Sequence, residues 1–288
     1  MDEFKKNLRQ SPGVRFFAYV LIFLICALIG MVLSFVFSRG NDIFMLKVAQ
    51  GVSSMMMFVA PPLIYYAFTR NSPFQSLGLH KPNRYVMWLI GLVLIFISLP
   101  VTNQLGIWNE KMNFSSAFQM LEDLLKQLEE TAGNLTERML EVDTVGGLLF
   151  NLVIIALIPA LGEELTFRGV LQQALVRRCK NAHVAIILSA AIFSFIHFQF
   201  YGFLPRMFLG ILLGYMFYYS GSLWTSVLMH FVNNGAAVTL AYLNHKGVVD
   251  VEVDHFGAMG MGWTIASLAL TVGIIVLSAK IYQKHGRE

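Results

Sequence analysis

Two adjacent glutamates and an arginine interrupt a stretch of the sequence that is otherwise apolar. Glu163, Glu164 and Arg168 lie inside a run that extends from about Leu148 to Val176. Charged side chains are costly inside a membrane and usually have a function there. Residues four apart share one face of a helix, so Glu164 and Arg168 are expected to pair while Glu163 points elsewhere. The pattern predicts one neutralised carboxylate and one that is available for chemistry.

Two histidines and an asparagine lie in apolar segments further along the chain. His197 is near the end of one segment, and His230 and Asn234 share a helix face in a later one. If the segments of Glu163 and His197 form an antiparallel hairpin about Lys180, both residues lie roughly 25 Å from its turn. We therefore expect Glu163, His197, His230 and Asn234 to meet at one depth, in the cytoplasmic half of the membrane.

These residue types together suit the attack of water on an amide. Glu163 would take a proton from the water, His197 would orient the water or help to deprotonate it, and His230 with Asn234 would donate hydrogen bonds to the oxyanion. Glu163, His197 and His230 also suit a zinc site with an open coordination position. The sequence leaves both mechanisms open, although the His-Glu-x-x-His motif is absent.

Two other protease chemistries are not supported. Every aspartate lies in a tail or a link between apolar segments, so an intramembrane aspartyl pair is not expected. A Gly-x-Ser-x-Gly motif is also absent, which disfavours a serine nucleophile on a strand-to-helix turn.

Transmembrane helices must position the candidate residues. The 288 residues are 56% hydrophobic and 13% charged, which is too apolar for a soluble domain of this size. About 20 apolar residues cross a bilayer. This predicts an all-α membrane bundle with about eight spans, at residues 16–37, 48–68, 85–105, 146–176, 183–200, 204–220, 222–243 and 261–282. We expect one transmembrane domain, 1–288, in which 146–243 is a catalytic four-helix core.

The distribution of charge predicts the orientation of the chain. The N-terminal segment, the link after the second span, the turn at 177–180 and the C-terminal tail are basic, and all four fall on one side. The link 102–144 on the other side holds three bases and eight acids. The positive-inside rule then places both termini in the cytoplasm, with the protein in the cytoplasmic (inner) membrane. Bases at span ends also explain the net charge of +4, so nucleic acid is not an expected partner.

Three further features bear on the fold. The link 102–144 contains an amphipathic helical pattern, which predicts a helix on the membrane surface in preference to a lid over the site. Its apolar positions are Phe118, Leu121, Leu125, Leu128, Leu135 and Met139. Pro61-Pro62 should bend the second span, and the spacing of Gly210 and Gly214 should allow two helices to pack closely.

Three motifs in the chain resemble those of the CPBP intramembrane proteases, a family that includes CAAX prenyl protease 2, Abi proteins and proteins like lysostaphin resistance protein A. Glu-Glu-x-x-x-Arg corresponds to residues 163–168, Phe-x-x-x-His to Phe193–His197 and His-x-x-x-Asn to His230–Asn234. The resemblance implies an intramembrane endopeptidase acting on a CAAX-type protein or on a peptide or bacteriocin. It also implies that Glu163, His197, His230 and Asn234 are catalytic and that Glu164, Arg168 and Phe193 are structural supports.

Two other functions are compatible with the sequence. Buried glutamate and histidine also form proton relays in transporters, but the inverted repeat and broken helices of many transporters are not detected. A membrane immunity or scaffold protein without activity could keep the same fold. The bilayer and a peptide or lipid-modified protein substrate are the expected partners, and zinc is the one cofactor that the residues suggest.

Overall fold

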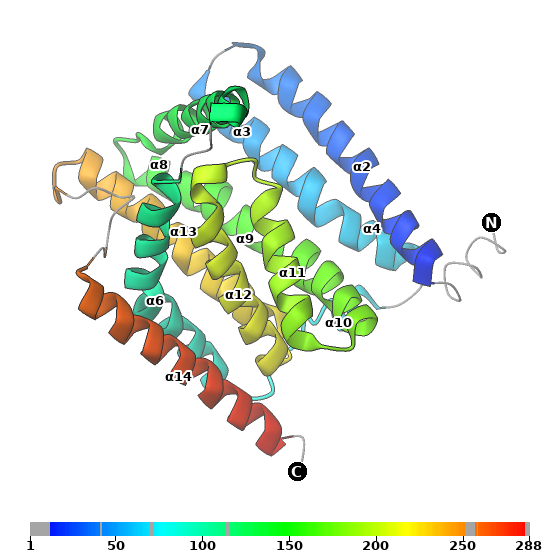
Figure 1. Ribbon diagram of the computed structural model, residues 1–288. Coiled ribbons are helices and arrows are strands. Elements are labelled where there is room, and N and C mark those ends of the chain that lie inside the picture. Colours follow the sequence, from blue (N-terminus) through cyan, green and yellow to red (C-terminus); the bar gives the residue numbers. More distant parts are fainter. Residues whose placement is uncertain are drawn as a thin grey trace.

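The described part of the protein is helical and contains no strand. The computed structural model describes residues 12–40, 42–69, 72–112, 116–250, 257 and 259–285. The basic residues Lys5, Lys6 and Arg9, which contribute to the predicted orientation, lie outside the described residues. The long helices run roughly along one direction and form a bundle (Figure 1). The prediction of an all-α membrane bundle is confirmed.

The helices follow the predicted spans in chain order. Their bounds are α2 Pro12–Phe37, α3 Ile43–Ser54, η2 Met55–Val59, α4 Ala60–Thr69, α5 Pro73–Ser76, α6 Val86–Glu110, α7 Gln119–Leu140, α8 Val145–Asn151, η4 Leu152–Leu157, α9 Ile158–Thr166, η5 Phe167–Gln172, α10 Gln173–Cys179, α11 Ala182–Phe195, α12 Phe203–Ser220, α13 Leu223–His245 and α14 Met261–His285. Short 3₁₀ turns are η1 Ser38–Gly40, η3 Ser116–Phe118 and η6 Phe200–Gly202.

Six helical segments of the described chain are long and apolar enough to cross a membrane. They are Gly13–Gly40, Ile43–Phe68, Val86–Glu110, Val145–Cys179, Phe200–Ser220 and Met261–Lys284. Helix α11 is apolar but shorter, and α13 is not in this group. The protein is therefore an integral membrane protein, and its predicted number of eight crossings is not confirmed.

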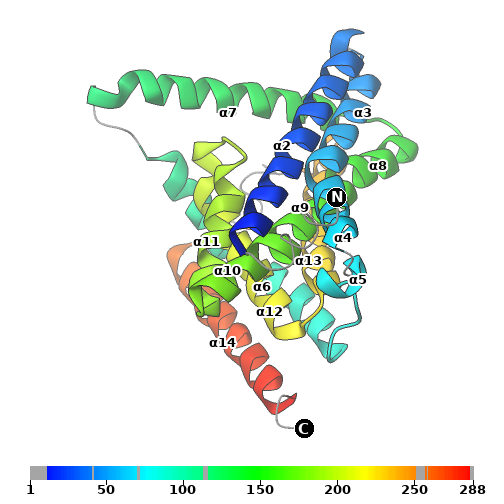
Figure 2. The same ribbon diagram turned by 90° about the vertical axis from the view of Figure 1, so that its right-hand side faces the viewer.

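Helix α7 lies across one end of the bundle, transverse to the long helices (Figure 2). Most of its predicted apolar stripe is exposed, including Leu121, Leu128 and Leu135, whereas Met139 is buried. An amphipathic helix with an exposed apolar stripe is typical of a membrane surface. The amphipathic helix predicted in the link 102–144 is confirmed as a structural element.

Helix α9 carries both glutamates between two π-helical segments. The π-helical segments η4 and η5 adjoin it at either end, and η2 occupies the second span immediately before α4. Pro61 and Pro159 each follow such a segment by a few residues. Proline has no backbone N–H, so the regular ladder of hydrogen bonds is interrupted near it. The irregularity expected at Pro61-Pro62 thus lies in the second span, and a similar one precedes Glu163.

Two glycines of α12 allow this helix to pack closely against its neighbours. A Cβ atom at Gly210 would lie 3.0 Å from Cβ of Ala190, and one at Gly214 would lie 2.7 Å from Oε1 of Gln172. The backbone carbonyls of both buried glycines accept hydrogen bonds, from Arg168 at 3.0 Å and from Gln172 at 3.0 Å. The close approach predicted for this glycine pair is confirmed, and it brings α12 to the charged segment.

We expect Gly210→Ala to destabilise the protein by about 1–3 kcal/mol, because the added methyl group meets the backbone of Ala190 in a close-packed contact. The measurement is thermal unfolding of the purified protein in detergent. Gly273→Ala is the matched control, since a Cβ atom at Gly273 in α14 has no neighbour within 4 Å. Equal melting temperatures for the two variants would contradict the prediction.

Candidate active site

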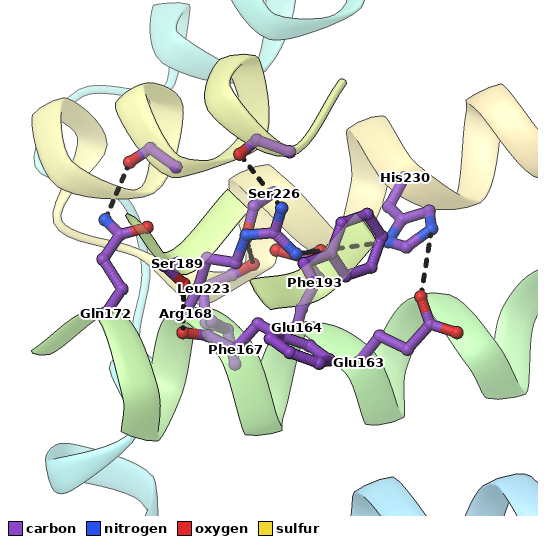
Figure 3. Close-up of polar contacts among 12 residues, drawn as sticks. Glu163, Glu164, Phe167, Arg168, Gln172, Ser189, Phe193, Leu223, Ser226 and His230 are labelled. Atoms are coloured by element: carbon purple, nitrogen blue, oxygen red, sulfur yellow. Dashed lines mark hydrogen bonds and ion pairs between the residues drawn. The ribbon is translucent and has the colours of Figure 1, made fainter. Parts of the chain in front are cut away.

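The predicted pair of Glu164 and Arg168 is a buried ion pair. Nη1 of Arg168 is 2.6 Å from Oε1 of Glu164, and the two side chains are 1% and 0% exposed. Arg168 also donates to the carbonyl oxygen of Gly210, and its guanidinium lies 4.7 Å from the ring centroid of Phe193 (Figure 3). Removing one partner of such a pair typically costs about 3–5 kcal/mol, because the other charge is left buried without compensation.

His230 lies between the two adjacent glutamates. Its Nδ1 is 2.9 Å from Oε1 of Glu164, and its Nε2 is 3.7 Å from Oε2 of Glu163. The ring is 3% exposed, so these contacts lie in the interior of the bundle. Each carboxylate therefore faces a different nitrogen of the same imidazole. The sequence predicted that Glu164 is neutralised and Glu163 is available, but it did not predict that one histidine would contact both.

His197 reaches the same place from α11. The chain turns at Lys180, which has a left-handed conformation with φ of 53°, and α11 then packs against α10 and η5. Nδ1 of His197 is 2.8 Å from the carbonyl oxygen of Phe193, and its Nε2 is 4.0 Å from Oε1 of Glu163. The hairpin about residue 180 brings Glu163 and His197 level with each other, as the sequence indicates.

Phe193 supplies the apolar contacts of the group. It is 1% exposed, and its ring centroid lies 5.1 Å from that of His197 and 6.0 Å from that of His230, both in edge-on arrangements. Together with the guanidinium of Arg168, these contacts surround the ring on several sides. Phe193 thus packs against both histidines.

Asn234 is not bonded to the other predicted site residues. It lies one helical turn beyond His230 on α13 and accepts a hydrogen bond from Nδ2 of Asn233 at 3.2 Å. In the described part of the chain it has no hydrogen bond to Glu163, His197 or His230. The structure therefore brings the glutamate and both histidines together, while the amide stays on the adjacent turn.

A structural or catalytic zinc ion requires three or four ligand atoms that converge on one point. Within the described ranges, no group of three or more His, Cys, Asp or Glu side chains is arranged to hold a metal ion. Each histidine faces a different oxygen of Glu163, at 4.0 and 3.7 Å. The residues of the candidate site do not fit zinc as they stand, so the metal-dependent mechanism gains no support.

Three residues around His197 were not predicted from the sequence. Nδ2 of Asn109 donates to the carbonyl oxygen of Phe200 at 2.9 Å, and Oε2 of Glu129 accepts from the backbone N–H of Tyr201 at 3.1 Å. Arg206 donates to Gln199. The sequence could have indicated Arg206, since it is a charged residue in an otherwise apolar segment. It could not have indicated Asn109 or Glu129, because polar residues are common at the end of a helix and in a helix on the membrane surface.

A cavity of about 870 Å³ adjoins this turn, and α7 forms one of its walls. Gln199, Tyr201 and Gly202 line it together with residues from the ends of α6 and α13. The cavity is therefore at the α7 end of the bundle, and the basic turn at 177–180 is at the opposite end (Figure 2). The predicted depth of the site in the cytoplasmic half stays a prediction.

Comparison with known proteins identifies the segment that carries this geometry. Residues 145–236, roughly a third of the chain, match the family model described as type II CAAX prenyl endopeptidase Rce1-like. Neither the curated proteins nor the solved structures include a match to the chain. The matched segment contains Glu163, Glu164, Arg168, both interior histidines and Asn234. Residues 145–236 are therefore similar to the Rce1-like family of type II CAAX prenyl endopeptidases.

Proposed function

We propose that this protein is an intramembrane endopeptidase in which Glu163 and His197 activate a water molecule, while His230 and Asn234 stabilise the oxyanion. One observation carries the proposal: Nε2 of His197 and Nε2 of His230 both face the carboxylate of Glu163, at 4.0 and 3.7 Å. These separations exceed a direct hydrogen bond. They suit a water molecule that bonds to the carboxylate and to one ring at the same time.

The partner of each Nδ1 defines what the opposite nitrogen can do. A carbonyl oxygen only accepts hydrogen bonds, so Nδ1 of His197 carries the proton that it donates to Phe193. Nε2 of a neutral His197 then has a lone pair directed towards Glu163. In the proposed reaction, the water donates a hydrogen bond to this lone pair through one of its hydrogens. It transfers the other hydrogen as a proton to Glu163, while its oxygen attacks the carbonyl carbon of the substrate.

His230 is the proposed donor to the oxyanion. Its Nδ1 donates to Glu164, so Nε2 donates a hydrogen bond only when the ring carries both protons. Oε1 of Glu164 contacts both Nδ1 of His230 and Nη1 of Arg168, so the ring is held between the two glutamates. Asn234 is the proposed second donor from the adjacent turn of α13. Preorganised donors of this kind stabilise the charge that develops in the transition state.

The proposed reaction needs no reactant other than water and the substrate. Glu163 passes the proton that it took from water to the leaving nitrogen, the carbon–nitrogen bond breaks, and a carboxylate and an amine are released. The family match supports a protein or peptide substrate of the CAAX type. The distribution of basic residues supports cytoplasmic termini.

We expect Glu163→Gln to lower the rate of cleavage by about 10²–10⁴-fold, because the amide cannot accept the proton from water. The measurement is mass spectrometry of a peptide library, including prenylated CAAX peptides, incubated with the purified protein. Asp123→Asn is the matched control, since Asp123 is an exposed carboxylate of α7. His230→Ala should lower the rate of cleavage to a similar extent as Glu163→Gln. Full activity in the Glu163 variant would refute the proposed mechanism, and a transporter would cleave nothing in any form.

We also expect cleavage to continue after treatment with a strong zinc chelator, because the candidate residues are not arranged as a metal site. The measurement compares initial rates before and after chelation, followed by addition of zinc. Activity that is lost on chelation and returns with zinc would show that the metal-dependent mechanism is the correct one.

A further inference from the structure

The turn that carries His197 has a strained backbone. Helix α11 ends at Phe195, and Phe198 has a φ of 53°, in the left-handed region. This conformation costs roughly 1–2 kcal/mol for a residue other than glycine. The side chain of Phe198 is 66% exposed and recovers little by burial inside the protein. Backbone strain of this kind persists only where surrounding contacts hold it. The residues that pack against this turn therefore stabilise its strained conformation.

Arg206 of α12 contacts the turn on both of its sides. Its Nη2 donates to Oε1 of Gln199 at 2.8 Å, and its Nη1 donates to the carbonyl oxygen of Gln199 at 3.4 Å. A Cβ atom at Gly202 would lie 2.8 Å from Nη2, so the glycine leaves room for the guanidinium to lie against the backbone. The side chain of Arg206 thus bonds to Gln199 and lies beside Gly202, within the turn that connects His197 to α12.

The charge of Arg206 is not explained by a direct ion pair. Arg206 lies in the apolar segment Phe200–Ser220, where a guanidinium is costly. In the described part of the protein its hydrogen bonds go to the neutral groups of Gln199, and no carboxylate lies within 4.0 Å of it. The guanidinium retained here bonds to the turn that follows His197.

We propose that Arg206 is a positioning residue of the proposed hydrolytic centre, which holds the turn at residues 197–202 so that Nε2 of His197 faces Glu163. The inference rests on the proposed function, because positioning matters only if His197 handles water. Asn109 and Glu129 bond to the later part of the turn, at Phe200, Tyr201 and Leu204. Of these three side chains, Arg206 bonds nearest to His197 along the chain, at Gln199.

The test compares Arg206→Gln and Arg206→Lys with the unmodified protein on one cleaved peptide. A misplacement of about 1 Å can cost about 100-fold in rate, so Arg206→Gln should lower kcat by about 10- to 100-fold and leave KM within about threefold. Arg206→Lys should recover part of kcat, because it keeps the charge and one donor. Arg178→Gln is the matched control, since Arg178 is exposed in the turn at the opposite end of the bundle.

Two further measurements separate positioning from a general loss of folding. Alkylguanidinium ions should raise kcat of Arg206→Ala and leave Arg178→Ala unchanged, which a misfolded protein would not show. Gln199→Ala removes the strongest acceptor of Arg206, so its effect on kcat should be less than additive with that of Arg206→Gln. An unchanged kcat, a rise in KM alone, or additive effects of the two substitutions would overturn the proposal. The proposed function fails separately, if the unmodified protein cleaves nothing or Glu163→Gln retains activity.

Discussion

The buried ion pair of Glu164 and Arg168 is the interaction on which the arrangement of the candidate centre depends. Withdrawing two charges from water costs several kcal/mol for each ion, and only close contact with further hydrogen bonds offsets this. Here the contact of 2.6 Å is supplemented by the carbonyl oxygen of Gly210 and by the ring of Phe193. Because Glu164 also binds Nδ1 of His230, the same pair determines how that imidazole is oriented.

The packing of the backbone makes this ion pair possible. A side chain at Gly210 would separate α12 from α11 and move the carbonyl oxygen that Arg168 requires. Gln172 uses the carbonyl of Gly214 in the same way, one turn further along, so the segment that carries the glutamates is bonded twice to α12 (Figure 3). In an apolar bundle, small residues and hydrogen bonds replace the hydrophobic driving force that holds helices together in water.

The two histidines of the candidate centre are oriented in the same way, but the backbone that carries His197 is less regular than the helix that carries His230. Both use Nδ1 for an anchoring hydrogen bond and direct Nε2 towards Glu163. His230 lies within the long helix α13 and is anchored to a buried carboxylate. His197 lies beyond the end of α11, before a residue with strained backbone, and its anchor is the carbonyl of its own helix. Its position therefore depends on contacts that α6, α7 and α12 make with the following turn.

Local periodicity made most of the fold predictable. The helices, their order, the amphipathic character of α7 and the pairing of Glu164 with Arg168 all follow from spacing of two to seven residues along one chain segment. Counting residues from Lys180 also placed Glu163 level with His197, since a tight hairpin fixes the register of its two helices. The roles of Glu163, His197, His230 and Asn234 in chemistry stay predictions, because they rest on residue types and a family resemblance.

The sequence by itself thus determined the helical membrane class and indicated that Glu163, Glu164, Arg168 and His230 lie in the interior. Only the tertiary structure decided that His230 contacts both glutamates and that Arg206 lies against the turn after His197. It also decided that Asn234 makes no hydrogen bond to the glutamates within the described residues. The reason is physical: a helix face is defined by residues a few positions apart, whereas the rotation and tilt of one helix against another depend on close packing between distant segments. Which nitrogen of an imidazole meets which carboxylate follows from that packing alone.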